Sequence, residues 1–390
     1  MKYKLLTVGF LIYIGLSFLV NGYSLANYYI NDLAVNNQFV DEGTTDSKLE
    51  YDYVSNVYKK MAYVDINGAF RRVLGQHELN GVVKLKNDHL VFLQPLTPDE
   101  TLSVCADETK KLSDALAKRG IEYMWFTLPY GVDKYVDEMP AGDYIDYGND
   151  TLDNFTAMLD DRGIRTVDLR DVIHAEGKTT YDYIYKTDHH WTSEGVLWAV
   201  SKMVAAVDET CGIPVDDSLY DIDNYDMTVY KNKQLGSCGT RTGQYFAGKD
   251  DFTLITPKFD TLLQNEKYGV EGTMPQVMMD VEALATDASA FYTYEAVNKG
   301  KTPNYEVHNP NAPQLRVLVI GDSMSLSEMP YISLAFSDVY CINSNYVDTL
   351  TEEFLDEYQP DIVISTYHLY NLYEEAFAYG LNNEYSDKSR

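Results

Sequence analysis

Two short segments, far apart in the chain, carry the residue types that acyl transfer needs. Asp188-His189-His190 sets a carboxylate beside two imidazoles, and about 130 residues later Asp322 leads into Ser323. A serine hydroxyl becomes a good nucleophile when a histidine accepts its proton, and a carboxylate then orients that histidine and stabilises its charged form. Unrelated folds build this geometry with different chain orders, so Asp, His, Ser is an acceptable order. The two segments therefore predict a Ser-His-Asp triad.

The spacing within the first segment favours one histidine as the base. In an extended segment, residues i and i+2 project to the same side, so Asp188 and His190 would face one pocket while His189 points away. We therefore predict His190 as the base, with His189 in a supporting position. The remaining histidines are scattered and are interpreted as structural, with His368 set apart because it follows a predicted strand; they are His77, His89, His174, His308 and His368.

A metal site is the main chemical alternative for the same residues. Asp188, His189 and His190 are all competent ligands, but adjacent residues without the i, i+4 spacing of a helical His pair seldom supply three convergent ligands. None of the four cysteines lies in a Cys-x-x-Cys pair, which gives no support to a zinc site. No metal and no cofactor are therefore expected.

Both segments resemble known families. Asp188-His189-His190-Trp191 resembles the signature of the DHHW family, and Gly321-Asp322-Ser323 resembles the nucleophile block of SGNH hydrolases. Together they resemble the AlgJ and AlgX type alginate O-acetyltransferases, in which an Asp-x-His precedes the Gly-Asp-Ser. The resemblance covers roughly residues 65–375 and includes further matches at Asn80–Lys84, Gly236-Ser237, Arg241–Gly243 and Pro360–Val363.

The resemblance also suggests how an oxyanion would be stabilised. Gly321 suits a tight turn after a strand, where the Ser323 amide can donate to an oxyanion. SGNH enzymes add an Asn side chain from a separate block, and no Gly-x-Asn in this chain matches it. By position alone, Asn345 and Tyr367 are the candidates for the second donor.

The resemblance implies an O-acetyltransferase that acts on an exported or cell-surface polysaccharide through an acetyl-serine, with acetyl supplied by a membrane protein resembling the MBOAT family. Two alternatives stay open. A carbohydrate acetyl esterase would use the same residues and differ only in letting water attack the intermediate. A glycan-binding module would retain the fold without the chemistry.

The N-terminus predicts export. Met1–Lys4 is basic, Leu5–Val20 has no charge, and no Lys or Arg follows until Lys48. This pattern indicates a signal peptide or an uncleaved signal anchor over residues 1–22, with the body outside the cytoplasm. Residues 23–64 are polar and are interpreted as a stem, and residues 65–390 as the catalytic domain.

A formal charge of −29 over 390 residues excludes nucleic acid as an expected partner, because binding phosphates needs a basic surface. The 34 tyrosines are compatible with contacts to sugars. Four cysteines allow three complete pairings, and Cys211 with Cys238 is the pair we favour, since both fall in one loop-rich segment.

The pattern of apolar residues predicts an SGNH-like three-layer α/β/α domain with a parallel sheet. Apolar runs alternate with amphipathic segments. Helices are expected over 98–119, 147–162 and 192–206, and strands over 121–129, 163–169, 316–320, 337–343 and 360–367. The run 316–320 is a central strand with Ser323 at its carboxyl end, where sites form in open α/β sheets. Residues 208–314 are interpreted as a β-rich insertion that shapes access to the site.

Overall fold

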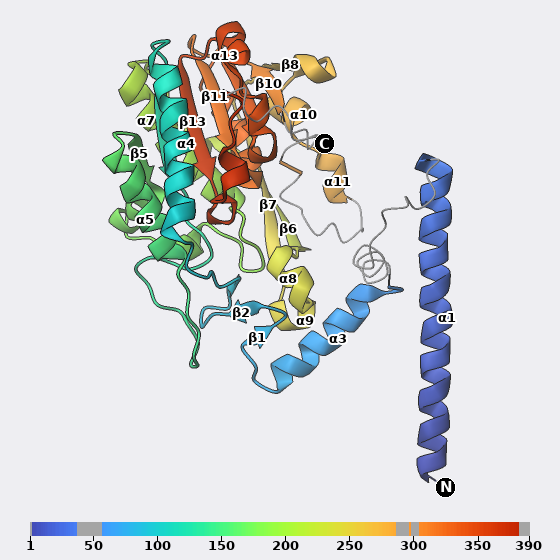
Figure 1. Cartoon of the computed structure of the whole chain (residues 1–390). Coiled ribbons are helices and arrows are strands. Elements are labelled where there is room, and N and C mark those ends of the chain that lie inside the picture. The colour runs from blue at the N-terminus through green and yellow to red at the C-terminus, as the bar shows by residue number, and fades with distance from the viewer. Residues whose placement is uncertain (1, 37–56, 286–295, 298–303, 382–390) are drawn as a thin grey trace.

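The computed structural model describes residues 2–36, 57–285, 296–297 and 304–381 (Figure 1). Its main sheet has eight strands in the order β5-β4-β13-β11-β12-β10-β8-β9. The first five strands of this order are parallel to one another; they are β5 (Arg165–Asp168), β4 (Glu122–Thr127), β13 (Ile362–Tyr367), β11 (Arg316–Gly321) and β12 (Asp338–Asn343). β11 lies in the interior of the sheet, between β13 and β12, as the sequence predicted.

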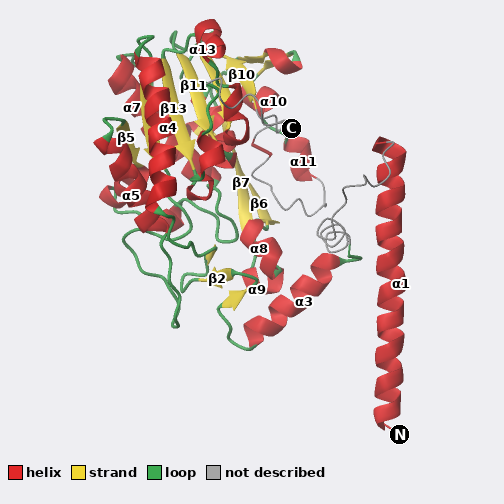
Figure 2. Ribbon diagram, viewed as in Figure 1, coloured by secondary structure: helices red, strands yellow, loops and turns green. Residues whose placement is uncertain are grey.

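Side chains of the central strands alternate between two hydrophobic cores. On one face, Phe126 and Val319 pack with α7 (Ser193–Cys211) and α12 (Ser323–Ile332). On the other face, Trp125 and Leu318 pack with α4 (Asp99–Ala117), α5 (Gly148–Asp161) and α13 (Glu352–Tyr358). Figure 2 shows the strands lying between these helices. The three-layer α/β/α prediction is confirmed.

The predicted helices and strands of the parallel half are found within a few residues of their expected bounds. The helix after the histidine pair, α7, differs most from its expected bounds. Thr192 caps α7 by accepting a hydrogen bond from Gly195 N at 3.0 Å, but the helix continues past the expected end at residue 206 to Gly212, which has a φ of 65°. Glycine is the residue that ends a helix in this left-handed conformation most readily. Val207 extends the buried face of the helix, which explains the extra turn.

Residues 208–314 are β-rich, but their strands do not form one separate unit. β10 (Asn304–His308), β8 (Leu263–Asn265) and β9 (Val270–Gly272) extend the main sheet with antiparallel pairing. β6 (Tyr225–Gln234) and β7 (Asp250–Pro257) pair with each other in a two-stranded sheet. A third sheet comes from an earlier part of the chain and combines β1 (Glu78–Leu79), β2 (Val82–Lys84) and β3 (Leu90–Val91). The described residues of the segment 208–314 also include the short helices α8 (Ser237–Thr242), α9 (Gln244–Ala247), α10 (Met274–Met278) and α11 (Val281–Ala285).

The described residues of the N-terminal part include the helices α1 and α3. α1 (Lys2–Asn36) continues through the first residues of the expected stem, and residues 37–56 of that stem lie outside the described part of the chain. Within the described residues, no helix meets the combination of length and hydropathy that a membrane span requires. α3 (Lys60–Val73) packs on the folded body: Asp65 accepts hydrogen bonds from the Gln244 backbone and side chain, both at 2.8 Å.

All four cysteines are free, so the Cys211–Cys238 pairing is wrong. Cys211 ends α7, whereas Cys238 is buried in α8 with Leu79 and Phe246. The two residues thus belong to different packing environments even though both fall in the segment between the catalytic blocks.

Candidate active site

Ser323 lies at the turn from the central strand β11 into α12, at the carboxyl end of the parallel strands. Asp322 is the N-cap of α12, and its side chain accepts a hydrogen bond from Met324 N at 2.8 Å. Ser323 is then the first residue of the helix, where a backbone N–H has no partner within the helix. Gly321 is needed for space, because a Cβ there would lie 2.6 Å from Ser325 Cβ and 2.7 Å from Thr366 Oγ1.

The structure brings Ser323, His190 and Asp188 together in one chain of contacts. His190 Nε2 lies 2.9 Å from Ser323 Oγ, and His190 Nδ1 lies 3.2 Å from Asp188 Oδ2. His190 and Asp188 are both almost completely buried. The structure thus brings the three predicted residues into contact, and their roles as nucleophile, base and orienting carboxylate stay a prediction.

His189 does not point away from this cluster, so that part of the prediction is wrong. The backbone over residues 187–190 is a series of bends and not an extended strand. The bends fold the chain around the Asp188 carboxylate, which accepts the His189 N–H at 2.9 Å. The His189 ring consequently lies 3.2 Å from Asp188 Oδ1 and 3.0 Å from Ser237 Oγ.

Two residues that hold Asp188 were not assigned a role from the sequence. Ser237 Oγ donates to Asp188 Oδ1 at 2.8 Å, and Gln234 Nε2 donates to Asp188 Oδ2 at 3.1 Å. Gly236, between them, packs so closely that an added Cβ would overlap the Asp188 side chain. Ser237 begins α8 and Gln234 ends β6, so both come from the segment after α7. Gly236-Ser237 was noticed only as part of the family resemblance.

The electrostatics of the pair suit a general base. Burial opposes ionisation of Asp188, but the adjacent His190 and the hydrogen bonds from His189 and His190 outweigh it, and they hold the pKa of Asp188 well below its usual value. Burial, together with nearby His189, lowers the pKa of His190, and Asp188 only partly opposes that shift. At neutral pH the site therefore combines an ionised carboxylate with a neutral imidazole.

A second carboxylate braces the nucleophile turn from the other side. Asp322 Oδ2 accepts hydrogen bonds from His368 N at 2.6 Å and from Asn371 Nδ2 at 2.7 Å. The His368 ring is buried with its centroid 5.1 Å from that of His189, and burial lowers its pKa well below the usual value. His368, which the sequence set apart for its place after a strand, thus belongs to the site's immediate surroundings.

The two positional candidates for a second oxyanion donor lie elsewhere. Asn345 is exposed, and its side-chain amide donates to Asn343 Oδ1 at 3.0 Å. Tyr367 donates to Ala376 O at 3.1 Å and stacks on Trp125 in the core on the α4 side of the sheet. The prediction failed for Tyr367 because it alternates to the face of β13 that lies away from Ser323.

Asp188, His189 and His190 each offer one potential metal-ligand atom, and these atoms lie within 4.8 Å of one another. The same carboxylate also accepts the hydrogen bonds from Ser237 and Gln234. One nitrogen of each ring contacts a serine: His190 Nε2 lies 2.9 Å from Ser323 Oγ, and His189 Nδ1 lies 3.0 Å from Ser237 Oγ.

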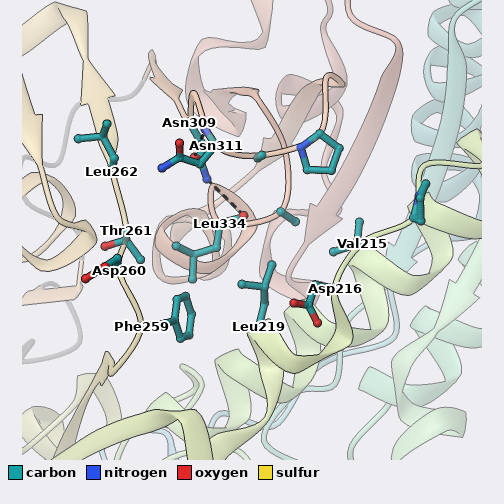
Figure 3. Close-up of a pocket in the computed structure, with 14 residues that line it drawn as sticks. Val215, Asp216, Leu219, Phe259, Asp260, Thr261, Leu262, Asn309, Asn311 and Leu334 are labelled. Carbon is teal, nitrogen blue, oxygen red and sulfur yellow. Dashed lines mark hydrogen bonds between the residues drawn. The ribbon is translucent and has the colours of Figure 1, made fainter.

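A pocket of about 260 Å³ opens at the far end of α12, lined by Phe259, Asn309 and Leu334 among others (Figure 3). Asn309 Nδ2 closes one side by donating to Leu334 O at 3.3 Å. At a rise of about 1.5 Å per residue, the helix separates this pocket from Ser323 by roughly 15 Å. The pocket contains none of the residues that surround Ser323.

Comparisons with known proteins agree with this architecture. Residues 92–218 match the family model of the SGNH hydrolase-like domain of the acetyltransferase AlgX. That range includes Asp188 and His190 and stops before Ser323. No curated protein matches the chain.

Several solved structures share the fold. A DHHW family protein from Eubacterium siraeum has a TM-score of 0.60 at 17% identity, over 78% of this chain and 97% of that one. Bacillus cereus PatB1 with a sulfonyl adduct has a TM-score of 0.59 at 17% identity, over 78% and 99%. A second structure of Bacillus cereus PatB1 has a TM-score of 0.60 at 18% identity, over 76% and 99%. Residues 92–218 are therefore similar to the SGNH hydrolase-like domain of AlgX, and the chain shares its α/β fold with a DHHW family protein and with PatB1.

Proposed function

We propose that the chain is an O-acetyltransferase that forms an acetyl-Ser323 intermediate and passes the acetyl group to a polysaccharide hydroxyl. The observation that carries this proposal is the contact of 2.9 Å between His190 Nε2 and Ser323 Oγ, backed by Asp188 at 3.2 Å from the other ring nitrogen. The family model matched by residues 92–218, whose description names an acetyltransferase, supports acyl transfer as the reaction class.

The first half-reaction acylates the serine. Ser323 Oγ attacks the acetyl carbonyl while His190 Nε2 takes the hydroxyl proton, and Asp188 stabilises the resulting imidazolium. The carbonyl oxygen becomes an oxyanion beside the N-terminus of α12, where the Ser323 N–H can donate to it. His190 then returns the proton to the leaving group, and the donor departs without its acetyl.

The second half-reaction decides between a transferase and an esterase. His190, neutral again, removes the proton from the acceptor hydroxyl, whose oxygen attacks the carbonyl of acetyl-Ser323. His190 then returns that proton to Ser323 Oγ as the ester bond to the serine breaks. Water reacts by the same route. A positioned sugar hydroxyl can outcompete water, because well-oriented intramolecular reactions reach effective molarities of about 10⁵ M or more. We favour transfer for this chain, and acetyl esterase activity is the alternative outcome of the test.

The proposal also includes a place of action. The basic Met1–Lys4 and the uncharged Leu5–Val20 support an N-terminal targeting segment and a body outside the cytoplasm. There the acceptor would be an exported or cell-surface polysaccharide. Acetyl would be supplied by a membrane protein of the MBOAT kind, since acetyl donors made in the cytoplasm must have their acetyl group carried across the membrane.

The test measures acetyl transfer to sugar and acetyl release to water in the same reaction. The purified protein is incubated with an activated acetyl ester and a panel of neutral and acidic oligosaccharides, and mass spectrometry follows acetylated sugar alongside free acetate. The proposal expects acetylated sugar to appear at the expense of acetate, and neither product from Ser323→Ala. Acetate release that no acceptor changes, together with deacetylation of acetylated glycans, would assign an esterase.

A further inference from the structure

Glu328 is a buried carboxyl group that the mechanism above does not use. It lies on α12, the helix that Ser323 begins, and its side chain is completely shielded from solvent. Trp191, the residue after His190, donates its indole N–H to Glu328 Oε1 at 3.2 Å. On the other side, Glu328 Oε2 and Thr366 Oγ1 are both buried without a well-formed hydrogen bond in this structure.

We propose that Glu328 is a positioning residue that ties the loop bearing His190 to the helix bearing Ser323, and that it does so as a neutral carboxylic acid. The inference rests on the proposed function, because it concerns how the base is held against the nucleophile. The carboxyl group touches neither Ser323 nor His190, and it acts through the residues that carry them.

The contacts define a bridge across three elements. Trp191 follows His190 directly in the chain, so a contact that holds its indole also limits the movement of the base. Glu328 belongs to the same ten-residue helix as Ser323. Thr366 lies on β13, two residues before His368, whose N–H donates to Asp322 at the start of that helix. A carbonyl oxygen that accepts from Trp191 and a hydroxyl that donates to Thr366 would satisfy all three elements at once.

The surroundings of Glu328 favour the neutral acid. Burial, reinforced by the charge of Asp322, raises the pKa of Glu328 to about 8. The titratable groups that interact with it are Asp322 at the helix start and the Cys341 thiol on β12, whose pKa burial raises to about 12. No cationic side chain among the described residues compensates it. Ionisation of Glu328 would therefore add a buried negative charge to the helix that Asp322 caps, where the charge of Asp322 disfavours it.

This arrangement makes pH a probe of the bridge. A group whose folded pKa is raised stabilises the fold fully below its unfolded pKa of about 4.5, and that contribution is lost as pH rises through about 8. In the wild type, kcat should then fall through an alkaline limb near pH 8, whereas thermal stability should fall progressively as pH rises from about 4.5 and level off above about 8. Glu328→Gln keeps an acceptor for Trp191 and donors for Thr366 and cannot ionise, so it should lack both the limb in kcat and this fall in stability.

The experiment compares Glu328→Gln with Glu328→Leu, using ester hydrolysis and thermal unfolding between pH 6 and pH 9. We expect Glu328→Gln to stay within about threefold of wild-type kcat at pH 7 and to keep its activity at pH 9. Glu328→Leu removes both hydrogen bonds at similar volume and should lose about tenfold or more in kcat with little change in KM, because small misplacements of catalytic groups cost rate. Trp191→Phe removes the other half of the contact and serves if Glu328→Leu fails to fold.

The outcomes separate the two proposals. If Ser323→Ala hydrolyses the ester as fast as the wild type, the proposed function fails, and the unfolding profiles still decide whether Glu328 is neutral. If Ser323 is required but Glu328→Leu or Trp191→Phe retains wild-type kcat, only the positioning role is refuted. An unfolding temperature that changes with pH identically in the wild type and in Glu328→Gln would overturn the neutral acid.

Discussion

Asp188→Asn is the substitution whose effect the structure defines most closely. Asp188 Oδ1 accepts from His189 N and Ser237 Oγ, and Oδ2 accepts from Gln234 Nε2 and faces His190 Nδ1. All these neighbours can be donors. An Asn side chain has one acceptor oxygen and one donor NH₂, so in either orientation the NH₂ meets groups that also donate.

The expected loss follows from that mismatch. If the amide NH₂ faces His190 Nδ1, the imidazole must take the tautomer with its proton on Nε2, and it then cannot accept the Ser323 proton. The corresponding Asp-to-Asn change in a serine-protease triad lowers kcat about 10⁴-fold, which is roughly 5 kcal/mol of transition-state stabilisation. We expect a loss of similar size here, because Asp188 is buried and water cannot replace it.

The assay is steady-state hydrolysis of a nitrophenyl acetate, with Asp250→Asn as the matched control. Asp250 braces the same loop through Thr187 N at 2.8 Å and Thr187 Oγ1 at 2.7 Å, but it orients neither histidine. Asp250→Asn should lose less than about tenfold, in keeping with a positioning contact. Equal losses in the two folded variants, or near wild-type rates for Asp188→Asn, would refute the assignment of Asp188.

Three further predictions follow from the same geometry. His190→Ala should be as inactive as Ser323→Ala in ester hydrolysis. His189→Ala should keep measurable activity, because His189 contacts Asp188 and Ser237. An inactive His189→Ala together with an active His190→Ala, both folded, would assign the base to His189. Because burial lowers the pKa of His190, kcat/KM should stay constant as the pH is lowered from 7 and should decrease only below about pH 6.5. A decrease of kcat/KM centred above pH 7 would contradict the buried neutral base. Gly236→Ala should lower both the unfolding temperature and kcat, because its Cβ would overlap Asp188, and unchanged values in both would show that the packing there is looser than the structure indicates.

The parallel half of the fold was predictable because its signals are local. Continuous apolar runs such as 316–320 are typical of strands buried on both faces, and Gly120 marked the turn after the first of the expected helices. The sheet arrangement of residues 208–314 could not be predicted from local signals. Whether a short strand such as β10 joins the main sheet or a separate one depends on pairing with β12, which begins 30 residues after it ends.

The residues of the site divide in the same way. Asp188, His190 and Ser323 could be named as candidates because their residue types and order carry chemistry, and the structure brings them into contact. His189 was misplaced because side-chain direction depends on local backbone shape, and the loop is bent where an extended segment was assumed. Gln234 and Glu328 were missed because a single Gln or Glu carries no signal until the fold buries it beside a triad residue or a Trp indole.

The central claim is that Ser323 is the nucleophile, and covalent labelling tests it most directly. The wild type, Ser323→Ala and His190→Ala would each be treated with an acetyl ester or a sulfonyl fluoride, quenched in acid and analysed by intact mass and peptide mapping. We predict a single adduct on the peptide that contains Ser323 in the wild type, much slower labelling in His190→Ala and none in Ser323→Ala. An adduct on Ser237 or another residue, or turnover of the ester by Ser323→Ala, would contradict the account.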